Sequence, residues 1–499
     1  MTRGSKMKNI VLAIILIIAA TLGILNGSYL IMAMYIGAVL VASYMMKDED
    51  TYNLLYAVLL VSVTFDYTLH VPGIQSIYMF HIVLGIFTLL SLYRAIKDRN
   101  VLLNLNRVVL SILVIWFIYM CISVVWAINR SLSIKYIAIY LMMFAFIVDM
   151  MIYNINKERL NKTINLLLGL ISFVIVVGFI EVLLGKQLPV RHYIDGFINS
   201  LPQWQINTIN ARPIVFSYNT NNLTATLAIL SPICLFAIYR FENIIAKVWF
   251  TLVSCIGFTL VVITTSRTGF FAFLFGFVVF IIYSILNVKN LGINQMIFPV
   301  VLIVGCILAF NYGSLLINIK PVDNEKPQIQ TSLSSKLHSL EGFTEGEVTD
   351  EDSTLHRMEI IKTVLNGVIA EKHYQGYGVG NVEQVIKNGG DTGSVYSPHA
   401  YPIEILGDFG LPGIALYGIY YLYLLIGNFI IGIKKKKIMC FAAVAGLIAF
   451  APAGFGPSSI TYVFSYWILM GFAISCIQVY RKIDNVYRPT SSIKEFKFM

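Results

Sequence analysis

The feature that most constrains this chain is a series of apolar runs, each roughly 17–25 residues long, repeated along its length. An α-helix of that length crosses the hydrocarbon core of a bilayer. Of the 499 residues, 58% are hydrophobic and only 12% are charged, and the mean hydropathy is +0.76. So little charge could not cover so much apolar surface in water. Transmembrane β-barrels need short alternating strands, which are not the pattern here, so we predict an all-α polytopic membrane protein.

We expect about 14 transmembrane helices, or about 12 if some segments are re-entrant. Their expected limits are 10–26, 29–46, 53–69, 76–93, 107–127, 135–153, 163–184, 222–239, 246–265, 269–287, 294–315, 401–432, 438–455 and 460–480. The basic residues before the first run could mark a cleaved signal peptide. The second run follows at once, near Tyr29, and this favours a retained first helix.

Lysine and arginine placement predicts the orientation, because short cytoplasmic loops carry an excess of these residues. The run Lys434–Lys437 between two apolar segments is the strongest marker. It places both termini in the cytoplasm and the longest loop on the extracytoplasmic side of the membrane. We divide the chain into N-terminal transmembrane helices (1–160), helices with a first outer loop (161–316), a large extracytoplasmic loop (317–400), C-terminal helices (401–480) and a cytoplasmic tail (481–499).

Two outer loops stand out, one near residues 185–221 and one near 318–400. The second is too long for a simple connector. Its segment 354–370 has helical apolar spacing, and Ser353 or Thr354 could cap it. We therefore expect a lid-like helix in this loop.

Several cationic side chains fall on the outer side, where positive charge should be scarce. They come from four separate regions of the sequence: Arg191 and Arg212, Arg267, Arg357, and His399. Arginine offers a planar fork of donors that matches phosphate oxygens. Each alone could be a headgroup contact, but together they favour a site for a lipid-linked diphosphate.

Ionisable residues also gather where the chain re-enters the membrane, between Ser397 and Gly413. His399 can exchange protons near neutral pH. Glu404 and Asp408 follow it and share a helix face if a helix begins near Tyr401. Either carboxylate could orient His399 or support the start of the helix. Ionisable groups at such depth are costly, so we treat the cluster as a candidate site.

The other signals favour structural roles. Gly376–Asn381 is interpreted as a tight turn, because no strand-helix unit precedes it. The acidic residues within 341–352 lack the EF-hand spacing and are expected to form a solvated loop, with a loose cation site as the alternative. The six cysteines form no CxxC pair, and the scattered histidines form no metal-ligand motif, so we expect no cofactor. The net charge of +10 fits topology better than nucleic-acid binding.

Four short motifs resemble those of the bacterial O-antigen ligase and O-antigen polymerase superfamily. In chain order they are Arg212 with Asn219-Thr220-Asn221, Ser266-Arg267-Thr268-Gly269, Arg357 with the turn Gly376–Asn381, and His399 to Gly413. Their order, their common side and the long loop before the histidine carry the resemblance, over about residues 160–480. The chain departs from the family pattern at Ala400, where Asn is frequent, and at Ile403, where Leu is common.

The resemblance implies a multi-span glycosyltransferase of the C type (GT-C), metal-independent and inverting, whose donor is a glycan on undecaprenyl diphosphate. His399 would act as general base, because the incoming sugar hydroxyl must lose a proton. Arginines would stabilise charge on the departing diphosphate. The expected substrate-binding residues are Arg267, Arg357, Arg212, Arg191, Asn221, Glu404 and Asp408.

Several functions stay open at the level of sequence. A polymerase would extend lipid-linked repeat units into a capsule, exopolysaccharide, O-antigen or teichuronic-type polymer, and a ligase would pass the glycan to lipid A-core or another acceptor. The chain is rich in Ile, Lys and Asn, as proteins from AT-rich genomes are. This favours the polymerase, since its reaction does not require an outer membrane. A lipid-linked oligosaccharide transporter is the main rival, although transporters place polar residues near mid-membrane. A non-catalytic scaffold or sensor of envelope polysaccharide is a third hypothesis. Flippase and chain-length regulator proteins are expected partners.

Overall fold

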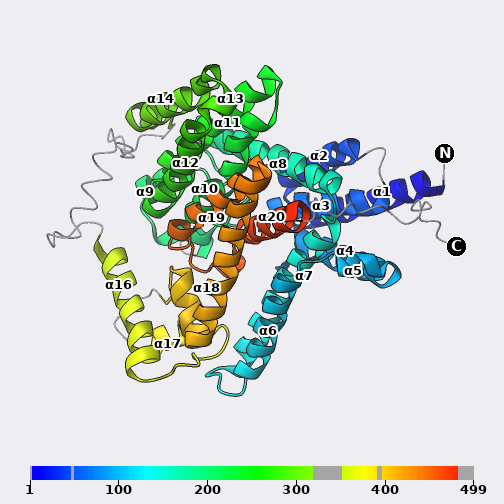
Figure 1. Ribbon diagram of the computed structural model, residues 1–499. Coiled ribbons are helices and arrows are strands. Elements are labelled where there is room, and N and C mark those ends of the chain that lie inside the picture. Colours follow the sequence, from blue (N-terminus) through cyan, green and yellow to red (C-terminus); the bar gives the residue numbers. More distant parts are fainter. Residues whose placement is uncertain (1–2, 47–49, 197, 318–350, 390–395, 482–499) are drawn as a thin grey trace.

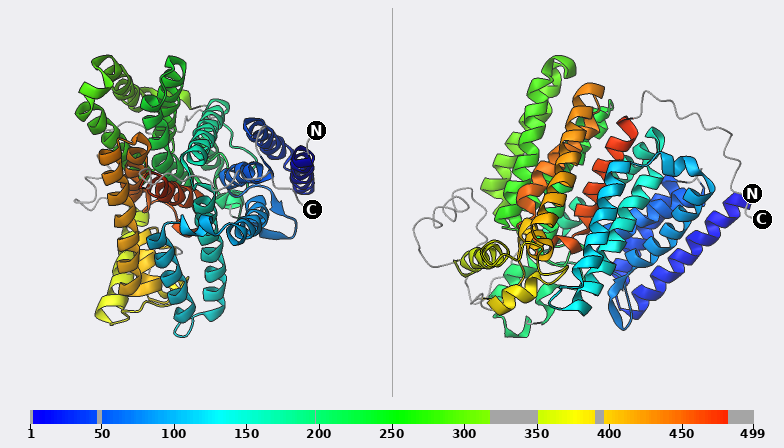
Figure 2. Two further views of the ribbon diagram at one scale, coloured as in Figure 1. Left: turned by 45° about the vertical axis from the view of Figure 1, so that its right-hand side comes forward. Right: turned by 60° about the horizontal axis from the view of Figure 1, so that its bottom comes forward.

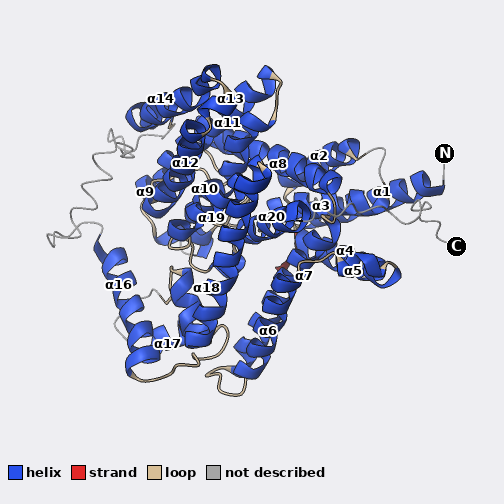
Figure 3. Cartoon of the chain, in the orientation of Figure 1, coloured by secondary structure: helices blue, strands red, loops and turns tan. Residues whose placement is uncertain are grey.

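The computed structural model describes residues 3–46, 50–196, 198–317, 351–389 and 396–481. Helices make up almost all of this part of the chain (Figures 1 and 3). Its strands are one antiparallel hairpin, β1 (His70–Val71) and β2 (Ile74–Tyr78). The prediction of an all-α polytopic membrane protein is confirmed.

The helices follow the chain from the N-terminus in three groups. The first group is α1 (Arg3–Leu25), α2 (Tyr29–Met45), α3 (Thr51–Thr64), α4 (Met79–Lys97), α5 (Arg99–Leu103), α6 (Arg107–Ser123), α7 (Arg130–Tyr153) and α8 (Lys157–Leu184). The second is α9 (Gln203–Asn210), α10 (Thr220–Arg240), α11 (Ile244–Ile263), α12 (Arg267–Leu286), α13 (Val288–Leu291) and α14 (Ile297–Tyr312). The third is α16 (Glu351–Leu365), α17 (Val382–Gly389), α18 (Tyr401–Lys435), α19 (Ile438–Ala453) and α20 (Phe464–Arg481).

Short turns of tighter or wider helix complete the described chain. The 3-10 turns are Tyr193–Gly196, Ile198–Ser200, Ile293–Met296, Gly313–Leu316 and Ile460–Tyr462, and a π-helical turn, Asn366–Ala370, ends α16. The lid-like helix expected at 354–370 therefore exists as α16 with its π turn. It starts at Glu351, so the prediction that Ser353 or Thr354 caps it is wrong.

Each of the predicted transmembrane segments contains a helix. Within the described ranges, nine helices are long and apolar enough to cross a bilayer, and shorter apolar helices include α2, α3, α6 and α19. Apolar run length predicts these helices well because in lipid every backbone N–H and C=O must form its hydrogen bond within its own helix. The axes of the long helices are roughly aligned (Figure 2). The helices α16 and α17 lie at one end of the bundle, and the start of α1 and the end of α20 lie toward the other. Which end faces the cytoplasm stays a prediction.

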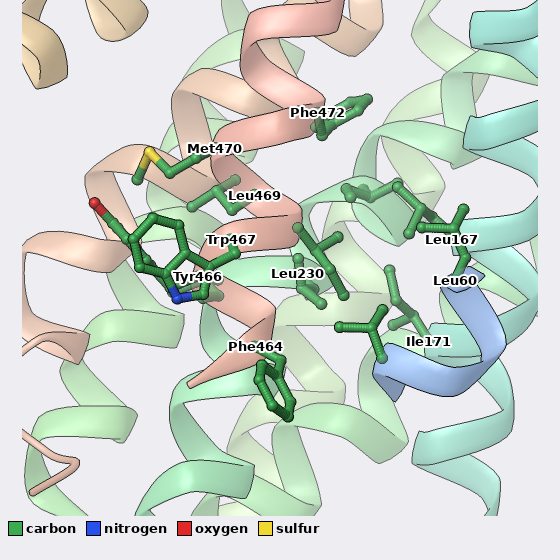
Figure 4. Close-up of a cluster of buried hydrophobic side chains, with 14 of the residues drawn as sticks. Leu60, Leu167, Ile171, Leu230, Phe464, Tyr466, Trp467, Leu469, Met470 and Phe472 are labelled. Atoms are coloured by element: carbon green, nitrogen blue, oxygen red, sulfur yellow. The ribbon is translucent and has the colours of Figure 1, made fainter. Parts of the chain in front are cut away.

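The centre of the bundle is formed by α20 and α10, whose residues are buried on nearly every side. Phe464 of α20 lies near Leu230 of α10 and Ile171 of α8 (Figure 4), whereas Trp467 packs against Tyr140 of α7. A helix that is apolar all round belongs inside a membrane bundle. Small residues let backbones approach: a Cβ on Gly446 of α19 would lie 2.7 Å from a carbonyl oxygen of α10.

The predicted single span at 401–432 is broken near its start. Gly410 has φ 64° and ψ −157°, so Tyr401–Phe409 forms a separate short helix before the long part of α18. The break frees backbone groups that bond to the outer loop: Tyr377 N donates to Gly407 O (2.8 Å) and Gly378 N to Asp408 O (3.0 Å). The outer loop is therefore docked onto the site where α18 changes direction.

Candidate functional site

His399 lies just before α18, at the end of the bundle that carries α16. Its φ is 45°, a left-handed conformation that is uncommon for a residue with a side chain. The ring Nδ1 lies 3.2 Å from Gly456 O. Next to it, Tyr401 N donates to Gly454 O (3.0 Å). The loop between α19 and α20 thus holds the ring of His399 and the backbone of Tyr401, two residues later.

This hydrogen bond fixes which ring nitrogen of His399 can accept a proton. A carbonyl oxygen only accepts, so Nδ1 carries hydrogen and Nε2 keeps its lone pair. Burial lowers the pKa of His399, the charge of Arg357 lowers it further, and the carbonyls of Gly456 and Pro457 raise it in part. The net shift is downward, so the ring is neutral at neutral pH. A neutral imidazole with a free Nε2 is the form that a general base requires.

Arg357 and Arg267 reach this place from two other regions of the chain. Arg357 lies in α16, and Arg267 is the first residue of α12. Burial lowers the pKa of the Arg357 guanidinium, and the neighbouring charge of Arg267 lowers it further. Arg357 therefore lies within electrostatic range of both Arg267 and His399.

Two helix N-termini meet beside these arginines. Thr224 Oγ1 in the second turn of α10 donates to Thr264 Oγ1 just before α12 (2.9 Å). A Cβ on Gly269 would lie 2.0 Å from the Thr224 methyl carbon, so the first turn of α12 touches the second turn of α10. Asn219 caps α10 by accepting from Asn222 N (2.9 Å), and Asn221 lies in that first turn. Helix N-termini carry partial positive charge and unpaired N–H groups, which adds to an anion-binding surface.

The loop 454–463 between α19 and α20 is a part of the site that sequence reasoning missed. Its Gly456 holds His399, and a Cβ on Gly456 would lie 2.9 Å from Thr268 Oγ1, next to Arg267. The available signal was the polar, glycine-rich stretch Gly454–Ser459 between two apolar runs. That stretch is where the loop links the histidine to the N-terminus of α12.

Glu404 and Asp408 both lie in the short first helix of α18, four residues apart as predicted, and both are buried. Glu404 accepts hydrogen bonds from Ser459 Oγ (2.5 Å), Thr461 Oγ1 (3.2 Å) and the Ile460 N–H (3.4 Å). These bonds fix the loop 454–463 rather than His399 itself. Glu404 is thus placed to position His399 through that loop.

Asp408 accepts from two backbone N–H groups of the glycine turn, Gly380 (2.7 Å) and Val382 (2.9 Å). The turn has positive φ at Gly376, Gly378 and Gly380, as a tight turn requires, so that interpretation of the sequence is confirmed.

Asn381 ties the same turn to α7, since its amide Nδ2 donates to Ser133 Oγ (2.8 Å). Asp408 and Asn381 together anchor the segment that follows α16 and so position Arg357.

The comparison with known proteins can now be set beside this geometry. A family model described as O-antigen ligase matches residues 252–418. The teichuronic acid biosynthesis protein TuaE of Bacillus subtilis (strain 168) is 21% identical over 428 residues, which cover 84% of this chain and 82% of that protein. Both matches support the O-antigen ligase and polymerase superfamily, which the sequence motifs resemble. The same matches support a role in polysaccharide synthesis as a ligase- or polymerase-type membrane protein.

The part of the chain that matches the family contains Arg267, Arg357 and His399, the three residues that the structure brings together. Arg191, Arg212 and Asn221 precede it. Arg191 stacks over the ring of Tyr218, 5.8 Å from its centroid. The described contacts do not join Arg191 or Arg212 to His399, so their roles stay predictions.

The first outer loop is held by Glu181 of α8, a buried carboxylate. It accepts from the N–H groups of Leu188 (2.6 Å), Ile214 (3.0 Å) and Val215 (2.8 Å). Because the last two follow Arg212 closely, Glu181 fixes the backbone that carries this arginine.

Side chains that could hold a metal ion do not cluster in the part of the chain that the structure describes. The acidic residues predicted to form a solvated loop, within 341–352, lie outside the described side chains.

Proposed function

We propose that this protein is a glycosyltransferase that polymerises undecaprenyl-diphosphate-linked oligosaccharide repeat units on the extracytoplasmic side of the bacterial plasma membrane. The observation that carries the proposal is the meeting of Arg267, Arg357 and His399 at one end of the bundle. Two fixed positive charges next to a neutral imidazole suit a reaction in which an anion departs and a hydroxyl loses its proton.

The two arginines would bind the diphosphate of the donor. Like charges held close together repel, and an anion bound between them offsets that repulsion because it attracts both. As the bond between the anomeric carbon and the diphosphate oxygen breaks, its electron pair goes to that oxygen. Arg267, Arg357 and the N-termini of α10 and α12 would stabilise the developing charge. We extend this surface to Arg212, Arg191 and Asn221 as contacts with the rest of the donor.

His399 would act on the acceptor. Nε2 takes the proton of the acceptor hydroxyl while its oxygen bonds to the anomeric carbon from the side opposite the diphosphate, which inverts the configuration. A positioned base of this kind contributes about 10²–10⁴-fold. The lipid diphosphate leaves, and the polymer gains one repeat unit. All charge in this scheme is balanced by protein side chains and backbone dipoles.

A ligase that passes the glycan to lipid A-core or another acceptor is the second candidate. The two reactions share their donor chemistry and differ in the acceptor hydroxyl. The name of the Bacillus relative, a teichuronic acid biosynthesis protein, favours a polymer of the cell surface as product. A transporter is disfavoured by the position of the charged residues at one end of the bundle. Flippase and chain-length regulator proteins would be the partners of a polymerase.

The test is chain extension by purified protein supplied with lipid-linked repeat units and no nucleotide sugar. We expect His399→Ala and Arg267→Ala each to reduce extension at least a hundredfold, about the contribution of a base or a charge-stabilising donor. His373→Ala is the matched control, because His373 is an exposed histidine of the same outer loop. The proposal fails if both site variants extend glycans at the wild-type rate.

A further inference from the structure

A groove of about 480 Å³ lies between α8 and α11, near the end of the bundle opposite His399. One row of lining residues comes from a single face of α8: Asn165, Leu168, Gly169, Ser172, Phe173 and Val176. Phe241, Trp249 and Phe250 form the other wall. Eleven residues of helix rise about 16 Å, and half of the hydrocarbon core is about 15 Å thick. The groove therefore matches one leaflet in length.

A positive charge lies at the mouth of this groove, where the hydrocarbon of the membrane meets the headgroups. Arg240, the last residue of α10, donates from Nη1 to Asn165 Oδ1 (2.9 Å) and from Nη2 to Asn161 Oδ1 (3.4 Å). Both partners are neutral amides. Among the described residues Arg240 forms no ion pair with a carboxylate, including Glu242 two positions later. Its charge is therefore available to an anion of the headgroup region.

The floor of the groove is open because of one glycine. Gly169 is exposed, and a Cβ placed on it would meet nothing within 4 Å. Further along, Ser172 is only 5% exposed, yet its Oγ has no hydrogen-bond partner. A buried hydroxyl without a partner costs stability unless a ligand or water supplies one. Ser172 thus marks a place where a polar group of an occupant would be favourable.

We propose that this groove binds one anionic phospholipid of the leaflet at that end of the bundle. One acyl chain lies along α8 against Phe173 and Phe250, and the phosphate lies at Arg240. The occupant is an amphiphile with an anionic head, since the groove is apolar along its length and cationic at its mouth. This lipid is distinct from the donor lipid, whose diphosphate binds at the opposite end.

The test uses the full chain purified in a mild detergent and measured by native mass spectrometry with added phosphatidylglycerol or phosphatidylcholine. We expect one phosphatidylglycerol per chain, with at least tenfold preference over phosphatidylcholine. Gly169→Leu should weaken binding of either lipid at least tenfold, because the added side chain occupies the groove and its Cβ meets no protein atom within 4 Å. Arg240→Gln should abolish the preference for phosphatidylglycerol and leave residual binding of both lipids.

Gly85→Leu is the matched control, since Gly85 is an exposed helical glycine of α4 with equally open space. It should bind phosphatidylglycerol as the wild type does. The proposal is overturned if Gly169→Leu retains wild-type binding, if the wild type binds both phospholipids equally, or if it retains an isoprenoid phosphate in their place. Should Gly169→Leu not fold, Arg240→Gln still decides the question, because unchanged preference in that variant refutes the role of the charge.

Discussion

The break in α18 offers a sharp test of how the outer loop is held. At Gly410, φ 64° and ψ −157° lie in a region almost exclusive to glycine, where another residue costs about 1–3 kcal/mol. A Cβ there would also lie 2.0 Å from Tyr374 O and 2.4 Å from Gly376 N, both backbone atoms. The turn must therefore move away if Gly410→Ala is introduced.

Three hydrogen bonds depend on that close approach: Leu411 N to Tyr374 O, Tyr377 N to Gly407 O, and Gly378 N to Asp408 O. Each contributes about 0.5–1.5 kcal/mol. Together with the backbone strain, Gly410→Ala costs about 3–7 kcal/mol against docking of the turn. Since about 1.4 kcal/mol is a factor of ten, the docked population should fall roughly a hundredfold or more.

The assay combines glycan extension by the purified variant with hydrogen exchange of the amides in residues 374–380. Gly410→Ala should lose at least tenfold in extension, because Arg357 is no longer held near His399, and these amides should exchange faster. Gly418→Ala in the same helix is the control: its Cβ would meet nothing within 4 Å, and alanine favours the helix by about 0.5–1 kcal/mol. Wild-type extension and unchanged exchange in Gly410→Ala would refute the reasoning.

Two further predictions concern the groups around His399. Burial and the charge of Arg357 lower the pKa of His399, so extension should fall only as pH drops below the ordinary histidine value of about 6.5. In Arg357→Gln the acidic limb of the pH–rate profile should move to higher pH, because that charge is gone. An unmoved limb would exclude Arg357 as a cause of the lowered pKa. Glu404→Ala removes the acceptor of the buried Ile460 N–H and of the half-buried Ser459 hydroxyl, at about 1–3 kcal/mol each, so thermal stability and extension should both fall. Glu383→Ala, at an exposed position, should change neither.

The helices could be predicted from the sequence because their hydrogen bonds are local. A long apolar run in lipid has one way to satisfy its backbone, and its limits follow from the run itself. The side of the membrane on which the cationic residues lie stays a prediction, which rests on Lys434–Lys437 and similar markers. The order of the four motifs predicted the superfamily that the comparisons support.

The partners of the ionisable groups could not be predicted in this way. The spacing of Glu404 and Asp408 was compatible with a direct contact to His399, but they bond to Ser459–Thr461 and to Gly380 and Val382. The break at Gly410 was likewise missed, since it depends on the approach of Tyr374 from a loop earlier in the chain.

The sequence by itself determined a bundle of membrane helices and a resemblance to one superfamily that the comparisons support, and it predicted His399 and the arginines as candidate site residues. Only the tertiary structure decided that loop 454–463 holds the ring of His399, that α10 and α12 join their N-termini beside Arg267, and that Arg357 completes the group from α16. The physical reason is separation along the chain. A hydrogen bond between residues 57 positions apart, such as that of His399 with Gly456, depends on how whole helices pack, and no local pattern encodes its partner.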